Sequence, residues 1–277
     1  MSRTIVVPIA DMHTMLKIGL MPPKVIEDEG TTYQTTHRQN DFQKKVLWKQ
    51  WEKVKKHIFG VKCDELVLLL MGDLIHGDKR AYQVYTTRMR TQGDVAIDLL
   101  LPYTNRASKT YSVAGTKWHV GEDGSVEDRI AKELGAYNRM AHLKLEVTIQ
   151  GIRFMLQHKG PTLGSRAWIL GNGMRLTLKD ASIKALQQGR RASDIYLWGH
   201  FHTFHHEPVS VKEPEGDRII HGYTLPAWTG ADEYALEKVK NLEYSHVGLV
   251  YFDIQDGKWE LKKQYIEFDN IERVRHG

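Results

Sequence analysis

Short apolar runs separated by polar, helix-like stretches dominate the first two thirds of this chain. Five of these runs are rich in β-branched or aliphatic side chains and are shorter than a typical helix, so each predicts a strand buried in a sheet. They are residues 5–10, 66–71, 110–114, 152–157 and 195–198. Pro8 lies inside the first run and has no amide hydrogen, which favours an edge strand or a bulge at that point.

A period of three to four residues predicts the helices. Between residues 39 and 59, apolar side chains such as Phe42, Val46 and Trp51 recur at this spacing among lysines, which indicates an amphipathic helix. Asn40 or Asp41 can serve as its N-cap. Further helices are expected at residues 94–103, 126–134 and 180–188, and later strands at residues 218–223, 246–252 and 258–268, with Gln255-Asp256-Gly257 as a hairpin turn.

The five early strands share a second feature, because each is followed by Asp, His or both. These residues are Asp11 and His13, Asp73 and His76, His119, His158, and the pair His200 and His202. The carboxyl ends of the strands are where open α/β sheets bind ligands. One histidine at a strand end is more often structural. The recurrence at five strand ends predicts a shared site.

These motifs, in this order, resemble those of the calcineurin-like metallophosphoesterases. They are Asp11-Met12-His13, Gly72-Asp73, Gly115-Thr116-Lys117-Trp118-His119, His158-Lys159-Gly160 and Gly199-His200-Phe201-His202, and they span residues 11–202. The resemblance implies an α/β fold that is a four-layer sandwich of two mixed β-sheets flanked by α-helices. It also implies a dinuclear metal centre in which a metal-bound hydroxide attacks the phosphorus of a phosphate ester in line.

Carried over to this sequence, the family pattern implies a ligand set for two divalent ions. One ion would take Asp11, His13 and His202, the other His158 and His200, and Asp73 would bridge them. A bridging carboxylate can hold two such ions about 3.5–4 Å apart around a phosphoryl group. Carboxylate and imidazole ligands without a thiolate suit manganese, iron, zinc or nickel, with manganese as the first choice.

The chain departs from the family at its third motif, where the usual sequence is G-N-H-[DE]. Thr116 stands in place of the asparagine ligand, and the histidine is displaced to His119. Two interpretations remain open. In the first, His119 is the general acid and Thr116 or a water fills the ligand position, since histidines titrate near neutral pH. In the second, His119 is itself a ligand and protonation falls to water or to another group such as His76.

Composition agrees with an enzyme of this size. A chain of 277 residues with 41% hydrophobic residues can bury a sizeable core, and no Pro/Gly/Ser-rich linker divides it, so residues 1–277 are expected to form one domain. Cys63 is the single cysteine, which excludes an internal disulfide and favours a reducing compartment, the cytoplasm. The longest apolar run is too short to span a membrane, and the N-terminal run, broken by Pro8, does not resemble a signal peptide.

Basic residues near the motifs suggest the substrate. Residues 14–36 form a long segment expected to be a functional loop or flap, and residues 77–91 mix cations with tyrosines. Cations interleaved with aromatics suit a nucleic-acid strand or a nucleotide, and the net charge of +5 is only moderately basic. DNA and RNA are therefore candidate substrates. The candidate substrate-binding residues are Lys79, Arg80, Lys117 and Arg166.

Other functions remain as alternatives. A phosphomonoesterase would use the same centre, whereas a serine/threonine protein phosphatase would be expected to show G-D-x-V-D-R-G and G-N-H-E, which this chain lacks. A nucleic-acid-binding subunit on the same fold without catalysis would be expected to have lost ligands, and at least six ligand positions are filled. Neither a G-x-S-x-G elbow nor a P-loop is present.

Overall fold

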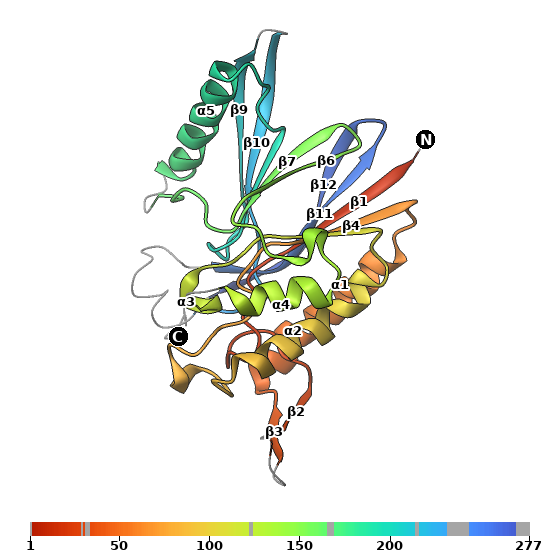
Figure 1. Cartoon of the computed structure of the whole chain (residues 1–277), viewed down its shortest axis with the longest axis vertical. Coiled ribbons are helices and arrows are strands. Elements are labelled where there is room, and N and C mark those ends of the chain that lie inside the picture. Colours follow the sequence, from red (N-terminus) through yellow and green to blue (C-terminus); the bar gives the residue numbers. More distant parts are fainter. Residues whose placement is uncertain are drawn as a thin grey trace, which may run out of the picture.

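Two five-stranded mixed sheets form the centre of the molecule (Figure 1). The computed structural model describes residues 2–28, 30, 34–121, 124–164, 169–213, 216–231 and 244–269. The first sheet has the order β12-β11-β1-β4-β5 and the second the order β6-β7-β8-β10-β9. In each sheet three neighbouring strands are parallel: β1, β4 and β5 in the first, and β7, β8 and β10 in the second.

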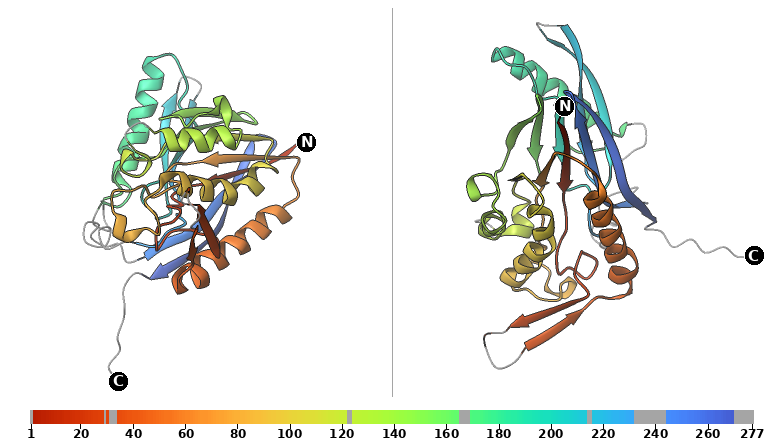
Figure 2. Two further views of the ribbon diagram at one scale, coloured as in Figure 1. Left: turned by 60° about the horizontal axis from the view of Figure 1, so that its bottom comes forward. Right: turned by 90° about the vertical axis from the view of Figure 1, so that its right-hand side faces the viewer.

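The strand bounds are as follows. The first sheet contains β1 (Arg3–Ile9), β4 (Glu65–Leu70), β5 (Lys109–Ser112), β11 (Tyr244–Gln255) and β12 (Lys258–Asp269). The second contains β6 (Leu145–Ile149), β7 (Ile152–Gln157), β8 (Ile195–Trp198), β9 (His205–Glu213) and β10 (Gly216–Thr224). A separate hairpin of β2 (Lys24–Asp28) and β3 (Gln34–Arg38) projects away from both sheets (Figure 2).

The helices cover the outer faces of the two sheets. A π-helical turn η1 (Gln43–Trp48) continues directly into α1 (Lys49–Gly60). Helix α1 lies on the side of the first sheet together with α2 (Met89–Thr104) and α4 (Ser125–Glu133) (Figure 1). Helix α5 (Asn172–Gln187) packs on β9 and β10 of the second sheet. The short helices are η2 (Ala81–Gln83), α3 (Lys117–Val120) and η3 (Tyr137–Arg139).

Alternating side chains of the strands build three apolar cores. In β1, Ile5, Val7 and Ile9 pack with α1, α2 and α4, while Val6 on the opposite face meets the second sheet. Phe154 and Leu197 meet Val6 from the second sheet, whose other face packs against α5. The layers are therefore helix, sheet, sheet and helix, which confirms the predicted four-layer fold class.

All five predicted early strands are present, and so are the later three. The helix expected from residue 39 is capped by a reciprocal pair, in which Gln43 N donates to Asn40 Oδ1 (2.9 Å) and Asn40 N donates to Gln43 Oε1 (3.1 Å). Asn40, and not Asp41, is the cap. The Gln255-Asp256-Gly257 turn joins β11 to β12, with positive φ at Asp256 (55°) and Gly257 (70°).

Several expectations were wrong. The edge position suggested by Pro8 is incorrect, because β1 lies between β11 and β4; its pairing with β11 ends at Val6, so Pro8 is beyond that ladder. Residues 14–36, expected to be a functional loop or a flap, contain β2 and the first residues of β3, so this segment is not an irregular loop. Helix α5 begins at Asn172 and not near residue 180, and β6 and β9 were not predicted. Within the described residues, no helix has the length and apolar character required to cross a membrane.

Candidate metal centre

The predicted motifs meet where the parallel strands of both sheets end. Ile9 is in register with Leu70 and Leu70 with Ser112, and in the second sheet Gln157 is in register with Trp198. The segments that follow the strands stay together through backbone hydrogen bonds, including Asp11 N to Gly72 O (3.0 Å) and His13 N to Asp73 O (3.1 Å). The loops after β1 and β4 thus present their polar side chains side by side.

Five of the predicted ligands adopt a left-handed backbone conformation. Their φ angles are 52° at Asp11, 43° at His13, 50° at Asp73, 72° at His200 and 55° at His202. Such a conformation costs a non-glycine residue about 1–3 kcal/mol and persists where the surrounding structure enforces it, often at functional sites. Half of the ten non-glycine residues with positive φ in the described chain are therefore predicted ligands.

Glycines allow the loops to approach the carboxylates closely. A Cβ on Gly115 would collide with Oδ1 and the backbone of Asp73. A Cβ on Gly199 would lie 2.8 Å from Asp11 Oδ2 and 3.0 Å from the His158 ring. The glycines of these two motifs are thus explained by packing against the predicted ligands.

Asp11, His13 and His202 form one group of potential ligands. His13 Nε2 lies 3.2 Å from His202 Nε2. Asp11 Oδ1 lies 3.8 Å from His13 Nε2 and 3.3 Å from His202 Nε2. All three ligand atoms fall within 4.8 Å of one another, as the sequence predicted for the first ion.

Asp73, His158 and His200 form a second group with the same compactness. His158 Nδ1 donates to Met71 O at 2.7 Å, which directs Nε2 toward Asp73 Oδ2 at 2.9 Å and Asp11 Oδ1 at 3.9 Å. The two carboxylates therefore lie at the boundary between the groups. His200 also joins them, since its backbone N donates to Asp11 Oδ2 at 2.9 Å.

The donor set of these groups fits divalent cations. His13 is buried, and burial together with the neighbouring His119 and His202 lowers its pKa well below the usual value. Burial and the adjacent His158 likewise lower the pKa of His200 to about 4. Neutral imidazoles facing buried carboxylates offer lone pairs and no competing positive charge, which is the state that binds metal ions.

His158 and Asp73 behave as a charged pair. Burial opposes a charge on His158, but the carboxylates of Asp73 and Asp11 raise its pKa to about 10. Burial also opposes the charge of Asp73. The attraction of the adjacent His158 is stronger than this effect of burial, and it holds the pKa of Asp73 well below its usual range. His158 Nε2 nevertheless lies outside the angular range of a hydrogen bond to any group in the described chain. This nitrogen is suited to exchange its proton for a metal ion.

The residues of the divergent third motif also reach the centre. Thr116 N donates to Asp73 Oδ1 at 2.7 Å, and the Thr116 hydroxyl lies 3.2 Å from both carboxylate oxygens. His119 Nδ1 pairs with His76 O at 2.7 Å, and its Nε2 lies 4.0 Å from Asp73 Oδ2. The His119 ring packs against His13, with 4.5 Å between centroids, so it lies beside the first group of ligands.

His76 joins His13 and His119 in a third cluster of nitrogen atoms. It is buried, its Nδ1 has no hydrogen-bond partner in the described chain, and burial together with His119 lowers its pKa to about 3. A neutral buried histidine of this kind is a weak proton donor at neutral pH.

Two positioning residues were missed by the sequence analysis. Glu127 in α4 is buried and accepts hydrogen bonds from Gly115 N (2.5 Å) and Leu74 N (3.1 Å), which ties together the loops that carry Thr116 and Asp73. Burial, reinforced by the charge of Asp73, raises the pKa of Glu127 to about 7. A glutamate in the first turn of a helix is so common that nothing in the sequence distinguishes this one.

Gln92 in α2 is the second missed residue. Its side chain accepts from His76 N (3.1 Å) and Gly77 N (2.8 Å) and donates to Gly77 O (2.9 Å) and Thr86 O (2.9 Å). One buried amide thereby satisfies four backbone groups of the loop after β4. The position of His76 depends on this clamp.

The predicted substrate-binding residues are only partly brought together. Arg80 lies over the ring of Trp118, with 5.8 Å from its Cζ to the centroid, one residue from His119. Lys79 and Lys117 are exposed on the same two loops. Arg166 lies outside the described residues, and so does the neighbouring Trp168.

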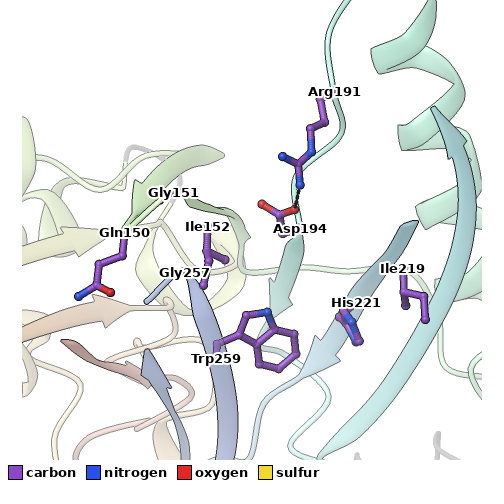
Figure 3. Close-up of a pocket in the computed structure, with 9 residues that line it drawn as sticks. All are labelled: Gln150, Gly151, Ile152, Arg191, Asp194, Ile219, His221, Gly257 and Trp259. Atoms are coloured by element: carbon purple, nitrogen blue, oxygen red, sulfur yellow. Dashed lines mark hydrogen bonds and ion pairs between the residues drawn. The ribbon is translucent and has the colours of Figure 1, made fainter. Parts of the chain in front are cut away.

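A cavity of about 300 Å³ lies at the other end of the sheets and contains none of the predicted ligands (Figure 3). The turns Gln150-Gly151 and Asp256-Gly257 bound it, and Trp259 and His221 line it near the first residues of β7 and β8. Arg191 bonds Asp194 at 2.7 Å on its rim. The site predicted from the sequence is therefore separate from this cavity.

No family model and no curated protein matches this sequence. Among solved structures, a phosphoesterase from E. coli, Yfce, aligns with 89% of this chain and 87% of its own at 13% identity and a TM-score of 0.41. Vps29 of Chaetomium thermophilum aligns at 12% identity over 98% and 97% with a TM-score of 0.38. A metallophosphoesterase from Sphaerobacter thermophilus aligns at 11% identity over 95% and 89%, also with a TM-score of 0.38. Likenesses this distant assign no activity to the chain.

Proposed function

We propose that this chain is a calcineurin-like, two-metal phosphoesterase that hydrolyses phosphodiesters, with nucleic acid or a nucleotide as substrate. The observation that carries the proposal is the convergence of six predicted ligands, from four strand ends, into two compact groups. Histidines that converge with two buried carboxylates on strained backbone are difficult to explain as fold stabilisation alone.

In this proposal Asp11, His13 and His202 hold one ion, and His158 and His200 hold the other. Asp73, which lies beside His158, would be shared by the two ions. Bound divalent ions supply Lewis-acid stabilisation of the charge on the phosphoryl oxygens. The donor set combines carboxylates and imidazoles without a thiolate, which suits manganese, iron, zinc or nickel, and manganese is the ion proposed first.

The residues around the ligands have separate tasks. Thr116 orients the Asp73 carboxylate through its backbone N and its hydroxyl. His119, whose Nδ1 is held by His76 O, presents Nε2 toward the centre, where a protonated imidazole can donate to the leaving oxygen. The alternative role of His119, as a ligand beside His13, rests on the 4.5 Å between their rings.

Substitution of the proposed ligands tests the proposal. Asp73→Asn and His200→Ala should each abolish hydrolysis of bis-p-nitrophenyl phosphate with added manganese, while circular dichroism shows a folded protein. Asp98→Asn in α2 and His57→Ala in α1 remove the same chemical groups away from the centre and serve as matched controls. Full activity in both ligand variants would overturn the proposal.

A second assay addresses the substrate. Added manganese should support cleavage of single- or double-stranded DNA or RNA, and a chelator should stop it. Binding of DNA that resists chelation and occurs without cleavage would favour the alternative, a binding subunit on the same fold. Cleavage of p-nitrophenyl phosphate but of no diester would favour a phosphomonoesterase.

A further inference from the structure

An exposed tryptophan stands at the rim of the proposed centre. Trp118 belongs to the four-residue helix α3, directly before His119, and 51% of its surface is accessible. It is the one tryptophan among the large exposed apolar side chains of the described chain. Tryptophan side chains are usually mostly buried, so an accessible indole beside the proposed centre indicates a role in binding.

The backbone that carries Trp118 is held in a defined position relative to His119. His119 N and Val120 N both donate to Thr116 O, at 2.9 and 3.0 Å, and these bonds close the turn that carries Trp118. The His119 side chain is anchored to His76 O, and its backbone carbonyl is so close to Gly77 that a Cβ there would collide with it. Movement of Trp118 would thus disturb His119.

A cation and a second aromatic side chain lie on the neighbouring loop. The Arg80 guanidinium lies over the Trp118 ring at 5.8 Å, within the range of a cation–π contact. Two residues later, Tyr82 is 68% accessible, and its carbonyl accepts from Lys17 Nζ at 2.7 Å. The loop after β4 therefore places a positive charge against the Trp118 ring and carries a further accessible aromatic ring.

We propose that Trp118, backed by Arg80, stacks on the base of the nucleotide whose phosphate occupies the metal centre, and so determines specificity for base-bearing diesters. The inference rests on the proposed phosphodiesterase function. A π-face accepts any base, and Arg80 adds charge for the phosphate backbone, so the preference is for nucleotides in general and not for a sequence. Trp118 acts on substrate binding, whereas His119 acts at the reacting phosphate.

The experiment compares two strands that differ only in their bases. One is a single-stranded oligonucleotide and the other is an abasic strand with the same number of phosphates. The wild-type protein should show a higher kcat/KM on the base-bearing strand. Trp118→Ala should lower the ratio of the two kcat/KM values about tenfold or more, through KM, because one base stack contributes that much to binding. Trp118→Phe should restore most of the ratio.

Two further variants separate stacking from charge and from general damage. Arg80→Ala should lower kcat/KM on both strands, because it removes charge that both strands recognise. Trp259→Ala makes the same truncation at the opposite end of the sheets and should leave the ratio unchanged. An unaltered ratio in Trp118→Ala, with both strands still cleaved, would overturn the role of Trp118 alone. Failure of the wild-type protein to cleave either strand or bis-p-nitrophenyl phosphate would overturn the proposed function itself.

Discussion

The two ends of the paired sheets carry similar polar residues, which differ in how they are paired. At the carboxyl ends of β1, β4, β7 and β8, aspartates and histidines face one another across short gaps. His13 and His202 meet nitrogen to nitrogen at 3.2 Å. Buried nitrogens of His13, His76 and His158 have no hydrogen-bond partner in the described chain.

At the opposite end the polar groups satisfy one another. Asp194 accepts from Arg218 Nη1 (2.6 Å), Arg191 Nη2 (2.7 Å) and Arg153 N (2.8 Å), and Glu213 accepts from Arg218 Nε at 2.6 Å. His221 Nδ1 pairs with His206 Nε2 at 2.9 Å. The cavity lined by His221 and Trp259 is thus surrounded by groups that already have partners (Figure 3).

The difference between the two ends shows that the pairing of polar side chains can indicate a ligand site that the position of the cavity does not. Paired charges at one end contribute to holding the fold together. At the other end, imidazoles crowd against one another and against two buried carboxylates on strained backbone, an arrangement that a bound cation would relieve. Four experiments can break or sharpen this contrast.

The largest effect is expected from a matched pair of aspartates. Asp11→Asn should lower kcat/KM by about a thousandfold or more with little change in stability, because it removes a ligand that faces other ligands. Asp194→Asn should leave kcat/KM intact and lower the free energy of unfolding by about 2–4 kcal/mol, because Arg218 and Arg191 lose one of their charged partners. Steady-state kinetics and urea unfolding measure both. If Asp194 proved essential for activity and Asp11 did not, the proposed difference between the two ends of the sheets would be wrong.

The second pair consists of glutamates. Glu127→Gln should lower kcat/KM about 10–100-fold, as other changes behind metal ligands do, because it weakens the hold on Gly115 and Leu74. The stability of the Glu127→Gln protein at neutral pH should be close to that of the wild type. Burial raises the pKa of Glu127 to about 7, so the side chain is already partly uncharged at this pH. Glu213→Gln should destabilise the protein without a change in kinetics. Equal kinetic losses in the two variants would show that Glu127 has no special role.

The third effect concerns metal removal. A ligand at a hundredfold excess over its Kd stabilises the folded state by about 2.7 kcal/mol, or about 5 °C in Tm for a chain of this size. Manganese should therefore raise the Tm of the chelated wild-type protein by this amount, and His13→Ala should abolish the rise. His206→Ala, which removes the partner of the cavity-lining His221 and no proposed ligand, should retain it. A rise that survives His13→Ala would place the stabilising ion elsewhere.

The smallest effect is a pH dependence at the cavity end. Burial and the neighbouring His206 lower the pKa of His221 to about 4, while Asp194 opposes the shift. The unfolded chain takes up a proton below about pH 6.5, whereas folded His221 remains neutral until about pH 4, so stability falls as the pH drops through this window. Between pH 7 and 4.5, wild-type protein should lose more stability in urea unfolding than His221→Gln does. Parallel losses would exclude this cause.

The sequence predicted the centre better than its surroundings. The motif residues could be expected to lie together because each follows an apolar strand, and parallel strands align their ends, as the register of Ile9 with Leu70 shows. The structure places His200 and His202 in two different groups, and their roles as ligands stay a prediction. Neither Glu127 nor Gln92 could be found, because each acts through backbone groups of loops brought close only by the fold.

Two of the missed strands, β2 and β9, share a physical reason. In β2 the buried positions are Val25 and Glu27, and a buried glutamate disguises the alternation of apolar and polar residues. Glu27 is satisfied by Thr86, Thr91 and His37, which are distant in sequence or lie across the hairpin. In β9, Glu207 at a buried position and Pro208 hide the pattern in the same way, and Pro208 is tolerated because β9 is an edge strand.

Anomalous diffraction from a manganese-soaked crystal tests the central claim most directly. We predict two peaks about 3.5–4 Å apart, one among Asp11, His13 and His202 and the other among His158, His200 and Asp73. The same map will show whether His119 is a ligand or lies free to act as the acid. The absence of peaks at these residues, or a peak only at the cavity end, would contradict the claim.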